Sequence, residues 1–449
     1  MATVTVDPNT SYQTFLGWQA TAQAGQSLNA TTDDENEYPS ATFGNYDTAL
    51  LTAMLDVGIN SFRIEWNFRD VNTTGYDTTG GTAIQPTTAT AGQWHYDRFT
   101  QAMDDVVLPY TTLLNAQGEP DPYLILCLVD FQDAGYDAEN STTEYAFAVN
   151  QIIDHFYDTY GFLPDAIEPI LEPDEGQNTT NWTAAKVANN MVAADALLVS
   201  NGFTGIRWIA PSTANGTIAN TWYNDMQTAN ASALGLMNIV SYHRYTAPSN
   251  AQLNTLRDNA ESDGNTTAML EYIGADIDDL YADLIEARNS MWQQFTVAYP
   301  ESFQTDNGAQ YFIVNRTTWA VTLGERTKYL RHYFKYIRRG AVMKGVTNSS
   351  SSYTGIPFEN ANGKWAVPIR CVGSGDIDVV GLPAGTYGIR YTLGNGTSAP
   401  SSYDQALSNQ TISAGQDVSF TMPGAGVVTV FDVDYMQPAL LTNYILNIV

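Results

Sequence analysis

Two short apolar segments each end in a glutamate, and both glutamates are placed to do acid–base chemistry. Residues 166–174 read Ala-Ile-Glu-Pro-Ile-Leu-Glu-Pro-Asp and carry Glu172, and residues 266–271 read Thr-Thr-Ala-Met-Leu-Glu and end at Glu271. A buried strand that delivers a carboxylate at its C-terminal tip is typical of a barrel active site. Hydrolysis of a glycosidic bond with retention needs two such groups, a nucleophile and a proton donor. The pattern therefore predicts Glu172 and Glu271 as a catalytic pair.

Each glutamate has a competing interpretation. Glu172 could be a charge at a helix N-terminus, because further acidic residues and a helical pattern follow it. Glu168 also precedes a proline and is the rival of Glu172, but its position in mid-strand predicts a buried ion pair instead. Close to Glu271, Asp276 is more typical of the N-cap of the next helix. The strand before each glutamate favours the catalytic interpretation of Glu172 and Glu271.

Composition limits the class of protein. The 449 residues are 44% hydrophobic, which is enough for one large barrel and a smaller domain. The net charge of −29 argues against nucleic acids or anionic membranes as partners. Two cysteines do not imply a disulfide framework. Because no Cys/His cluster and no glycine-rich phosphate loop is evident, we expect no metal and no cofactor.

No signal peptide or membrane-spanning run is evident in the sequence. A strand-like segment directly after Met1 predicts the mature form of a secreted protein whose leader has been removed. Asn-x-Ser/Thr sequons are plentiful, but a chain rich in Asn and Thr produces some by chance, so glycosylation is left open.

Strand and helix patterns alternate between residues 13 and 340. Apolar runs predict eight strands, at residues 13–18, 60–65, 123–130, 166–171, 206–211, 237–242, 267–270 and 311–314. Helical patterns separate them, including those at 46–55, 141–160, 184–200, 277–295 and 325–339. The helix at 141–160 opens with the capping box Ser-Thr-Thr-Glu. This alternation predicts an α/β protein with a (β/α)8 TIM barrel.

The pattern changes after Gly340. Short alternating runs at residues 365–371, 377–380, 387–393, 418–422 and 427–433, separated by Gly and Pro, predict an appended antiparallel β-sandwich. The strand-like residues 3–6 are expected to pair with it. We therefore expect a catalytic barrel at 13–340, a side domain built from 1–12 and 341–435, and a C-terminal tail at 436–449 that docks on the protein or makes an oligomer contact. The oligomeric state itself stays open.

Three segments of the chain carry a resemblance to a known family. Residues 4–18 read Val-Thr-Val-Asp-Pro-Asn-Thr-Ser-Tyr-Gln-Thr-Phe-Leu-Gly-Trp, and residues 329–342 read Tyr-Leu-Arg-His-Tyr-Phe-Lys-Tyr-Ile-Arg-Arg-Gly-Ala-Val. Residues 419–430 read Ser-Phe-Thr-Met-Pro-Gly-Ala-Gly-Val-Val-Thr-Val. In this order they resemble the entry into the barrel, the last barrel helix with its exit into the β-domain, and the closing strands of glycoside hydrolase family 30, a family of clan A barrels. The resemblance spans nearly the whole chain and implies a carbohydrate substrate.

The resemblance also implies a role for each glutamate. In clan A the fourth strand usually ends Asn-Glu-Pro with the Glu as acid/base, and Leu171-Glu172-Pro173 occupies that place. The nucleophile of the seventh strand corresponds to Glu271. The departure is Leu171, because the usual Asn hydrogen-bonds the 2-hydroxyl of the sugar and a leucine cannot. Specificity for ordinary glucans or xylans is therefore in doubt.

Other residues are implied as substrate-binding or supporting groups. Arg63 matches the clan's second-strand arginine, which supports the nucleophile, although it could be a structural barrel arginine. His243 and Tyr245 match the aromatic pair after the sixth strand, although His243 could be a satisfied core histidine. Four more candidates lie near strand ends, where rings could stack on sugars or a carboxylate could bind them: Trp18, Trp66, Trp319 and Asp130. Core packing is the competing interpretation for the tryptophans.

The sequence thus predicts a retaining hydrolase of β-glycosidic bonds in an oligo- or polysaccharide, with Glu271 as nucleophile and Glu172 as acid/base. The alternative is a non-catalytic glycan-binding or surface protein on a degenerate barrel. That alternative is motivated by Leu171 and by the many sequons.

Overall fold

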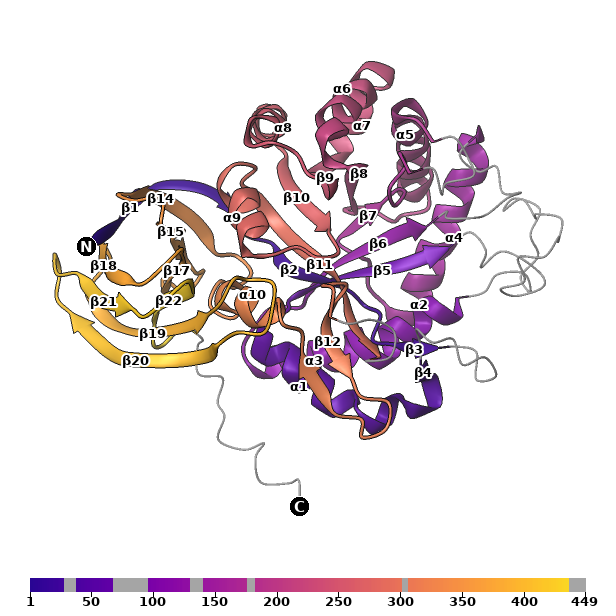
Figure 1. The fold of residues 1–449 in the computed structure, drawn as a ribbon. Helices are drawn as coiled ribbons and strands as arrows, with labels where there is room; N and C mark the ends of the chain where they lie inside the picture. The colour runs from indigo at the N-terminus through magenta and orange to yellow at the C-terminus, as the bar shows by residue number, and fades with distance from the viewer. Residues whose placement is uncertain (28–37, 68–95, 130–139, 176–181, 301–305, 436–449) are drawn as a thin grey trace.

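The structure, a computed structural model, describes residues 1–27, 38–67, 96–129, 140–175, 182–300 and 306–435. Within these ranges the chain forms an α/β barrel and, beside it, a mostly antiparallel β-sandwich (Figure 1). The predicted fold class is confirmed. Asp130 and the predicted tail at 436–449 lie outside the described residues.

Eight parallel strands close the barrel, because its last strand pairs with both its first and its seventh. Their order around the barrel is β2 (Gly17–Thr21), β5 (Ser61–Asn67), β6 (Tyr123–Val129), β7 (Ala166–Glu168), β8 (Arg207–Asn215), β9 (Met237–Thr246), β10 (Thr266–Glu271) and β11 (Asn289–Pro300). All eight C-terminal ends therefore meet at one end of the barrel, where a parallel barrel holds its active site.

Helices surround the barrel (Figure 1). They are α1 (Asp47–Val57), α2 (Asp97–Gln101), which continues through η5 (Ala102–Val107) into α3 (Leu108–Ala116), α4 (Thr142–Tyr160), α5 (Ala184–Ser200), α6 (Ala219–Ala229), α7 (Ser232–Leu236), α8 (Asn250–Ser262), α9 (Ile277–Ile285) and α10 (Thr327–Phe334). Local signals begin some of them, since the side chain of Ser141 accepts the backbone N–H of Glu144 at the start of α4. Their apolar faces bury the outward side chains of the strands in one large core.

The inside of the barrel has an apolar half and a polar half. A separate core fills the half near the strand beginnings: Tyr123, Ile125, Ala166, Ile209, Ile239, Ala268, Leu270 and Met291. Above it the inward side chains are polar and fully buried, including those of Gln19, Thr21, Arg63 and Gln293. A buried polar layer needs internal partners or a function, so it marks the C-terminal half of the barrel as the place to look for a site.

The second sheet forms the sandwich. Its order is β20 (Ser402–Ile412), β19 (Gly385–Leu393), β22 (Gly426–Asp432), β17 (Trp365–Cys371), β16 (Phe358–Glu359), β14 (Val342–Asn348), β1 (Ala2–Thr14), β18 (Gly375–Val380) and β21 (Val418–Met422), with β15 (Tyr353–Gly355) beside β17. The N-terminal strand-like segment does join this sheet, because β1 pairs with β14 and β18. The boundaries of the two domains stay a prediction.

The eighth barrel strand is not the one that the sequence predicted. The expected helix at 277–295 ends with α9 at Ile285, and residues 289–300 form β11 instead. The expected strand at 311–314 lies in β12 (Gln310–Val314), which pairs with β11 outside the closed barrel and with β13 (Val321–Leu323). Most residues of β11 are buried, its polar ones included, so the segment has no exposed face of the kind a surface helix needs and fits a central parallel strand.

Candidate active site

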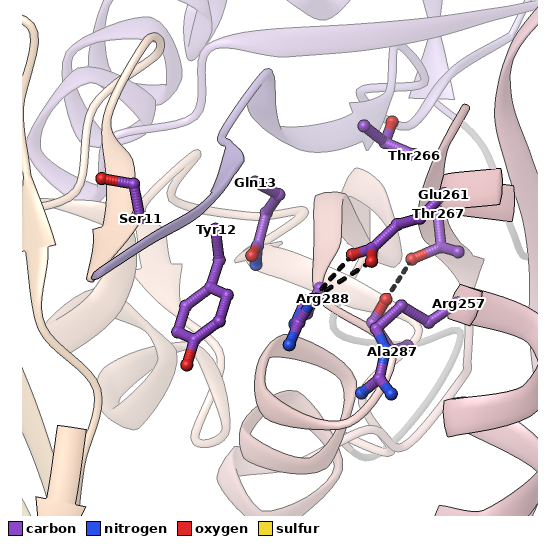
Figure 2. Close-up of a pocket in the computed structure, with 9 residues that line it drawn as sticks. All are labelled: Ser11, Tyr12, Gln13, Arg257, Glu261, Thr266, Thr267, Ala287 and Arg288. Carbon is purple, nitrogen blue, oxygen red and sulfur yellow. Dashed lines mark hydrogen bonds and ion pairs between the residues drawn. The ribbon is translucent and has the colours of Figure 1, made fainter. Parts of the chain in front are cut away.

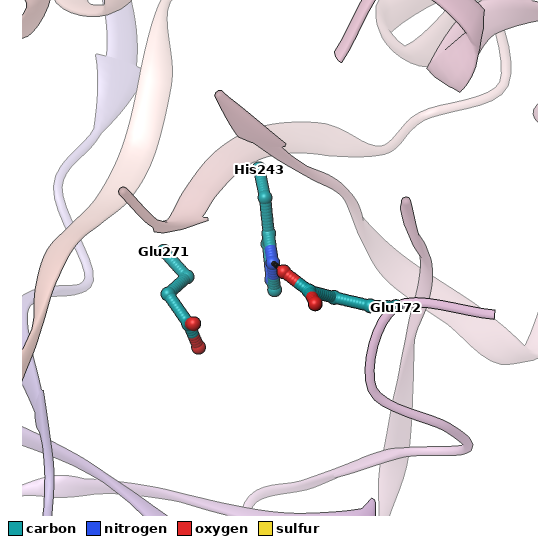
Figure 3. A group of neighbouring side chains, drawn as sticks. All are labelled: Glu172, His243 and Glu271. Atoms are coloured by element: carbon teal, nitrogen blue, oxygen red, sulfur yellow. Dashed lines mark hydrogen bonds and ion pairs between the residues drawn. The ribbon is translucent and has the colours of Figure 1, made fainter. Parts of the chain in front are cut away.

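Glu271 ends β10 and points into the barrel because of an irregularity in the strand. Ala268 and Leu270 face the barrel interior, so strict alternation would turn Glu271 toward the helices. The pairing of β10 with β9 shifts register between Met269 and Glu271. Such a bulge changes the direction of the side chain that follows it. The bulge therefore delivers the Glu271 carboxylate to the interior site (Figure 3).

Two donors hold the carboxylate of Glu271. The fully buried Arg63 of β5 binds Oε2 through Nη2, and the Tyr245 hydroxyl donates to Oε1 at 2.8 Å. The same Nη2 lies 3.2 Å from Glu65 Oε1, and Arg63 Nε donates to Thr21 Oγ1 at 3.1 Å. The guanidinium is therefore fixed on several sides. Charge-assisted hydrogen bonds of this kind stabilise a carboxylate in its ionised form.

Glu172 lies in the turn that follows β7, and its backbone is left-handed with φ of 48°. Its N–H donates to Ser212 O at 3.2 Å, and its carbonyl accepts from Glu175 N at 3.0 Å. Asp174 in the same turn accepts two backbone N–H groups of β8, at 2.7 and 3.0 Å. A left-handed glutamate is uncommon and persists where the surroundings determine it. The end of β8 thus anchors the turn that positions Glu172.

Burial raises the pKa of Glu172 to about 8. Loss of hydration is the main cause, three neighbouring carboxylates add to it, and Arg63 opposes it. His243 Nδ1 lies 2.7 Å from Glu172 Oε1. Burial lowers the pKa of His243, so its imidazole is neutral at pH 7. A neutral ring nitrogen can accept a hydrogen bond from a protonated carboxyl, so the pair favours a proton on Glu172.

The two carboxyl groups are close together. One oxygen of Glu172, one of Glu271 and a ring nitrogen of His243 all lie within 4.8 Å of one another (Figure 3). Retaining glycosidases have carboxyl groups about 5–5.5 Å apart and inverting ones about 6.5–9.5 Å. The three groups are also possible metal ligands, but Arg63 and Tyr245 already occupy Glu271, and the charge of Arg63 opposes a cation there. The geometry suits acid–base chemistry.

The structure therefore brings five of the predicted site residues together: Glu172, Glu271, Arg63, His243 and Tyr245. Leu171 is buried and forms a small apolar cluster with Cys127 and Val129. The side chain before the acid/base candidate thus packs on an apolar wall.

Two of the predicted sugar-binding tryptophans are core residues. Trp18 is fully buried, stacks on Phe334 of α10 with ring centroids 4.3 Å apart, and donates its indole N–H to Ile337 O at 2.7 Å. Trp66 belongs to the core between barrel and helices, on the face of β5 that also carries Phe62. Both predictions were wrong because these strand positions face outward, away from the barrel interior.

Trp319 is partly buried after β12 and stacks on Tyr46 with ring centroids 5.9 Å apart. It stays a candidate for sugar binding.

Two other interior residues matter more than the sequence suggested. Thr21 orients Arg63, and nothing in its sequence context indicates this. Glu168 is fully buried as expected, but no ion pair within 4 Å joins it to another described residue, so the predicted ion pair is wrong.

A hollow of about 320 Å³ lies at the opposite end of the barrel, near the start of β10 (Figure 2). Its charged groups are already paired, since Arg288 binds Glu261 at 3.0 Å and Arg257 binds Asp258 at 2.7 Å. Arg288 also lies over the ring of Tyr12 at 4.3 Å. Because this end of a barrel usually serves stability, we interpret the hollow as the joint between β1 and the barrel.

Comparisons with known proteins agree with this architecture. The catalytic domain of GH30 xylanase C from Talaromyces cellulolyticus superposes with a TM-score of 0.69 at 17% identity, covering 96% of this chain and 99% of that chain. The chain has the fold of glycoside hydrolase family 30. The endo-beta1,6-glucanase BT3312 gives 0.66 at 14% identity, with 96% and 93% covered. A conserved exported protein from Bacteroides fragilis gives 0.68 at 12%, with 96% and 100% covered.

No protein-family model matches the sequence, and no curated protein sequence matches it either. The family 30 resemblance inferred from sequence segments is thus confirmed at the level of the fold. One matched enzyme is named as a xylanase and another as a glucanase, so this fold does not choose the sugar. Among the described helices, none is long and apolar enough to cross a membrane.

Proposed function

We propose that the protein is a retaining glycoside hydrolase that cleaves β-glycosidic bonds in an oligo- or polysaccharide. One observation carries the proposal: two carboxyl groups within 4.8 Å have opposite surroundings. Glu271 receives an arginine and a hydroxyl donor, whereas Glu172 is desolvated and its pKa is raised to about 8. Divergent environments around neighbouring carboxyl groups are what separates a nucleophile from an acid.

In the first step Glu271 attacks the anomeric carbon while Glu172 gives its proton to the leaving glycosidic oxygen. Arg63 and Tyr245 orient the nucleophile, and the raised pKa keeps Glu172 protonated at neutral pH. The product is a glycosyl ester on Glu271 and a released alcohol.

In the second step Glu172, now ionised, takes a proton from water, and the oxygen of that water attacks the anomeric carbon. The ester bond to Glu271 breaks, and the sugar leaves with its original configuration. Transfer of the proton to Glu172 restores the starting state. The 2.7 Å contact with His243 Nδ1 keeps the carboxyl in place through both steps.

The matched structures and Leu171 support three further inferences, on the substrate class, on secretion and on the 2-position of the sugar. We infer a carbohydrate substrate because the matched structures include a GH30 xylanase and an endo-beta1,6-glucanase. We also infer secretion, because one matched structure is described as an exported protein. The apolar Leu171 wall supports a substrate that differs from a common glucan or xylan at the 2-position.

The test combines a substrate screen with the nucleophile variant. Aryl β-glycosides and polysaccharides are assayed with the wild type, Glu271→Ala and Glu172→Ala. We expect Glu271→Ala to be inactive and azide to rescue it, giving a glycosyl azide of inverted configuration. Glu172→Ala should keep activity only on activated leaving groups. Near-wild-type turnover by Glu271→Ala would remove it as the nucleophile.

The binding-protein alternative makes a different prediction from the same screen. Saturable binding of a glycan with no product, unchanged by Glu172→Gln, would favour it. The raised pKa of Glu172 and the two donors on Glu271 are not needed for binding alone. These features support the enzyme over the alternative.

A further inference from the structure

The end of β9 carries two of the side chains that contact the candidate catalytic pair. Tyr245 donates its hydroxyl to Glu271 Oε1 at 2.8 Å, and His243 Nδ1 lies 2.7 Å from Glu172 Oε1. Both side chains face the barrel interior, and Arg244 lies between them on the opposite face of the strand. The direction of this short segment therefore sets one contact to the nucleophile candidate and one to the acid candidate.

The ladder between β9 and β10 stops before the end of β9. Its last pair joins His243 to Glu271, so Arg244 and Tyr245 lie beyond it. Tyr245 is also 41% exposed, so packing holds its ring only in part. This side of the segment needs another support.

The ladder on the β8 side is irregular at the same place. Thr213 of β8 pairs with Tyr242, and Asn215 pairs with Thr246. A step of two residues on β8 thus faces a step of four residues on β9, which is a bulge in β9. Residues 243–245 lie inside this bulge, where the ladder is disrupted. Backbone pairing therefore does not fix their direction.

Arg244 supplies a support from the helix α9. Its Nη1 donates to Asp283 Oδ1 at 2.6 Å, and its Nη2 donates to Asp279 Oδ1 at 3.0 Å. Arg244 is 6% exposed and Asp283 is fully buried, so salt screens the shorter ion pair little. The two aspartates lie one helical turn apart, so the two arms of one planar guanidinium reach both. We call these three residues the Arg244 clamp.

Asp283 is itself held in place by other elements. Its Oδ1 also accepts the Tyr242 hydroxyl at 2.6 Å, and its Oδ2 accepts the indole N–H of Trp292 in β11 at 2.9 Å. From the sandwich, Arg370 of β17 forms an ion pair with Asp278, so α9 is fastened to both domains (Figure 1). The helix therefore gives the Arg244 clamp a fixed base.

A charged clamp does something here that apolar packing would not. Apolar side chains of similar volume often pack as stably as a buried ion pair does. They do not fix a direction, whereas the planar fork of an arginine on two carboxylates does. Because α9 begins at Ile277, six residues after Glu271, the clamp also ties the end of β9 to the chain that leaves the nucleophile candidate.

Resting on the proposed function, we propose that Arg244 is a positioning residue: its ion pairs to α9 set the direction of the end of β9, so that Tyr245 reaches the nucleophile and His243 reaches the acid. Arg244 leaves the outer face of the barrel, so it acts only through its two neighbours. Without the clamp the end of β9 shifts, and the Tyr245 hydroxyl loses its contact with Glu271.

A double-mutant cycle between Arg244→Met and Tyr245→Phe tests the proposal. The two side chains leave opposite faces of β9, so a coupling between them passes through the direction of the strand. The measured quantity is kcat/KM on an aryl glycoside with an activated leaving group, which reports attack by Glu271 and needs no proton from Glu172.

The expected result is a loss that depends on the Tyr245 hydroxyl. Arg244→Met should lower kcat/KM about tenfold when Tyr245 is present and less than about twofold in the Tyr245→Phe background. A merely structural role lowers the active fraction and acts alike in both backgrounds. An equal loss in both would overturn the proposal.

Tyr242→Phe is the matched control. It removes another buried hydrogen bond to the same oxygen of Asp283 and leaves both ion pairs of Arg244 in place. We expect its Tm to fall and its kcat/KM to stay within about twofold of the wild type. A loss of activity as large as that of Arg244→Met would show that any damage to this network has the same effect, and the specific role of Arg244 would be wrong.

Arg244→Lys covers the case in which Arg244→Met does not fold. Lysine keeps the charge beside α9, but a single ammonium does not span both Asp279 and Asp283 as a fork. Its kcat/KM should lie between those of the wild type and Arg244→Met, and this loss should again disappear in the Tyr245→Phe background. A folded Arg244→Lys variant whose loss is the same with and without the Tyr245 hydroxyl would contradict the positioning role.

The proposal and the proposed function fail separately, because thermal unfolding reads the same cycle without a substrate. Tyr245→Phe removes a hydrogen bond to a charged group and should lower Tm, by less than about half as much in the Arg244→Met background as in the wild type. If this coupling is found and no glycoside is cleaved, the hydrolase assignment falls and the placement of Tyr245 by Arg244 stands. If the loss of Tm is equal in both backgrounds, the positioning role is wrong even in an active enzyme.

Discussion

Replacing Glu172 with glutamine should make the protein more heat-resistant at high pH and not at low pH. The folded protein raises the pKa of this carboxyl from 4.5 to about 8 because the group is desolvated. Below pH 4.5 the carboxyl is protonated in both the folded and unfolded states, so it has no effect on stability. As pH rises toward 8, the unfolded chain releases the proton and the folded protein keeps it. Stability contributed by this site is therefore lost through that window.

The size of the effect follows from the shift. At about 1.4 kcal/mol per pH unit, the full penalty above pH 8 is about 5 kcal/mol, as an upper bound. An unfolding entropy of about 2.1 cal/mol/K per residue gives about 0.9 kcal/mol/K for a chain of this length. If the chain unfolds as one unit, Tm of Glu172→Gln should gain about 5 °C relative to the wild type between pH 4.5 and pH 9.

Differential scanning calorimetry from pH 4.5 to pH 9 measures this gain, and it needs no substrate. Glu175→Gln is the control, because it removes a charge from the same turn while Glu172 can still ionise. That variant should retain most of the wild-type loss of stability with rising pH. A difference between Glu172→Gln and wild type that stays within about 1 °C across the range would refute the reasoning about a desolvated acid.

Three further changes test the surroundings of the two glutamates. Tyr245→Phe removes a hydrogen bond to a charged Glu271, worth about 1.5–3 kcal/mol, so kcat/KM on aryl glycosides should fall about 10–100-fold; an unchanged value contradicts the role of the hydroxyl. Arg63→Met leaves Glu271 and Glu65 without their buried partner and should destabilise the fold by about 3–5 kcal/mol in denaturant titrations, whereas a neutral effect would show that the pair is dispensable. Leu171→Asn places an amide against an apolar wall at a cost of about 1–3 kcal/mol, so turnover of common β-glucosides, β-galactosides and β-xylosides should not rise; a tenfold gain would show that the site fits an ordinary sugar.

Much of the fold could be predicted because its signals are local. The helix at 184–200 was predicted with the bounds that α5 has, and the β-strands at 365–371 and 418–422 match β17 and β21. Each of these segments carries its own periodicity and its own boundary residues. The alternation of such segments was enough to predict a barrel with an appended β-domain.

The eighth strand could not be predicted for a non-local reason. The segment 289–300 mixes polar and apolar residues without a strict alternation and is buried on both faces, so its pattern does not separate a helix from a buried strand. Closure of the barrel makes residues 289–300 a strand, because β10 and β2 each need a partner at their free edge. That requirement exists only when the other seven strands are assembled.

Some features of the candidate site were likewise visible in the sequence, and others arise only in the folded protein. The two candidate carboxylates could be singled out from the sequence, because a glutamate after an apolar strand is visible at Glu172 and at Glu271. The direction of both side chains and the raised pKa of Glu172 depend on the tertiary structure. A register shift turns Glu271 inward, the end of β8 anchors the turn of Glu172, and burial beside His243 raises the pKa of that acid. Direction and desolvation depend on neighbours from distant parts of the chain, and for the same reason Trp18 became a core residue.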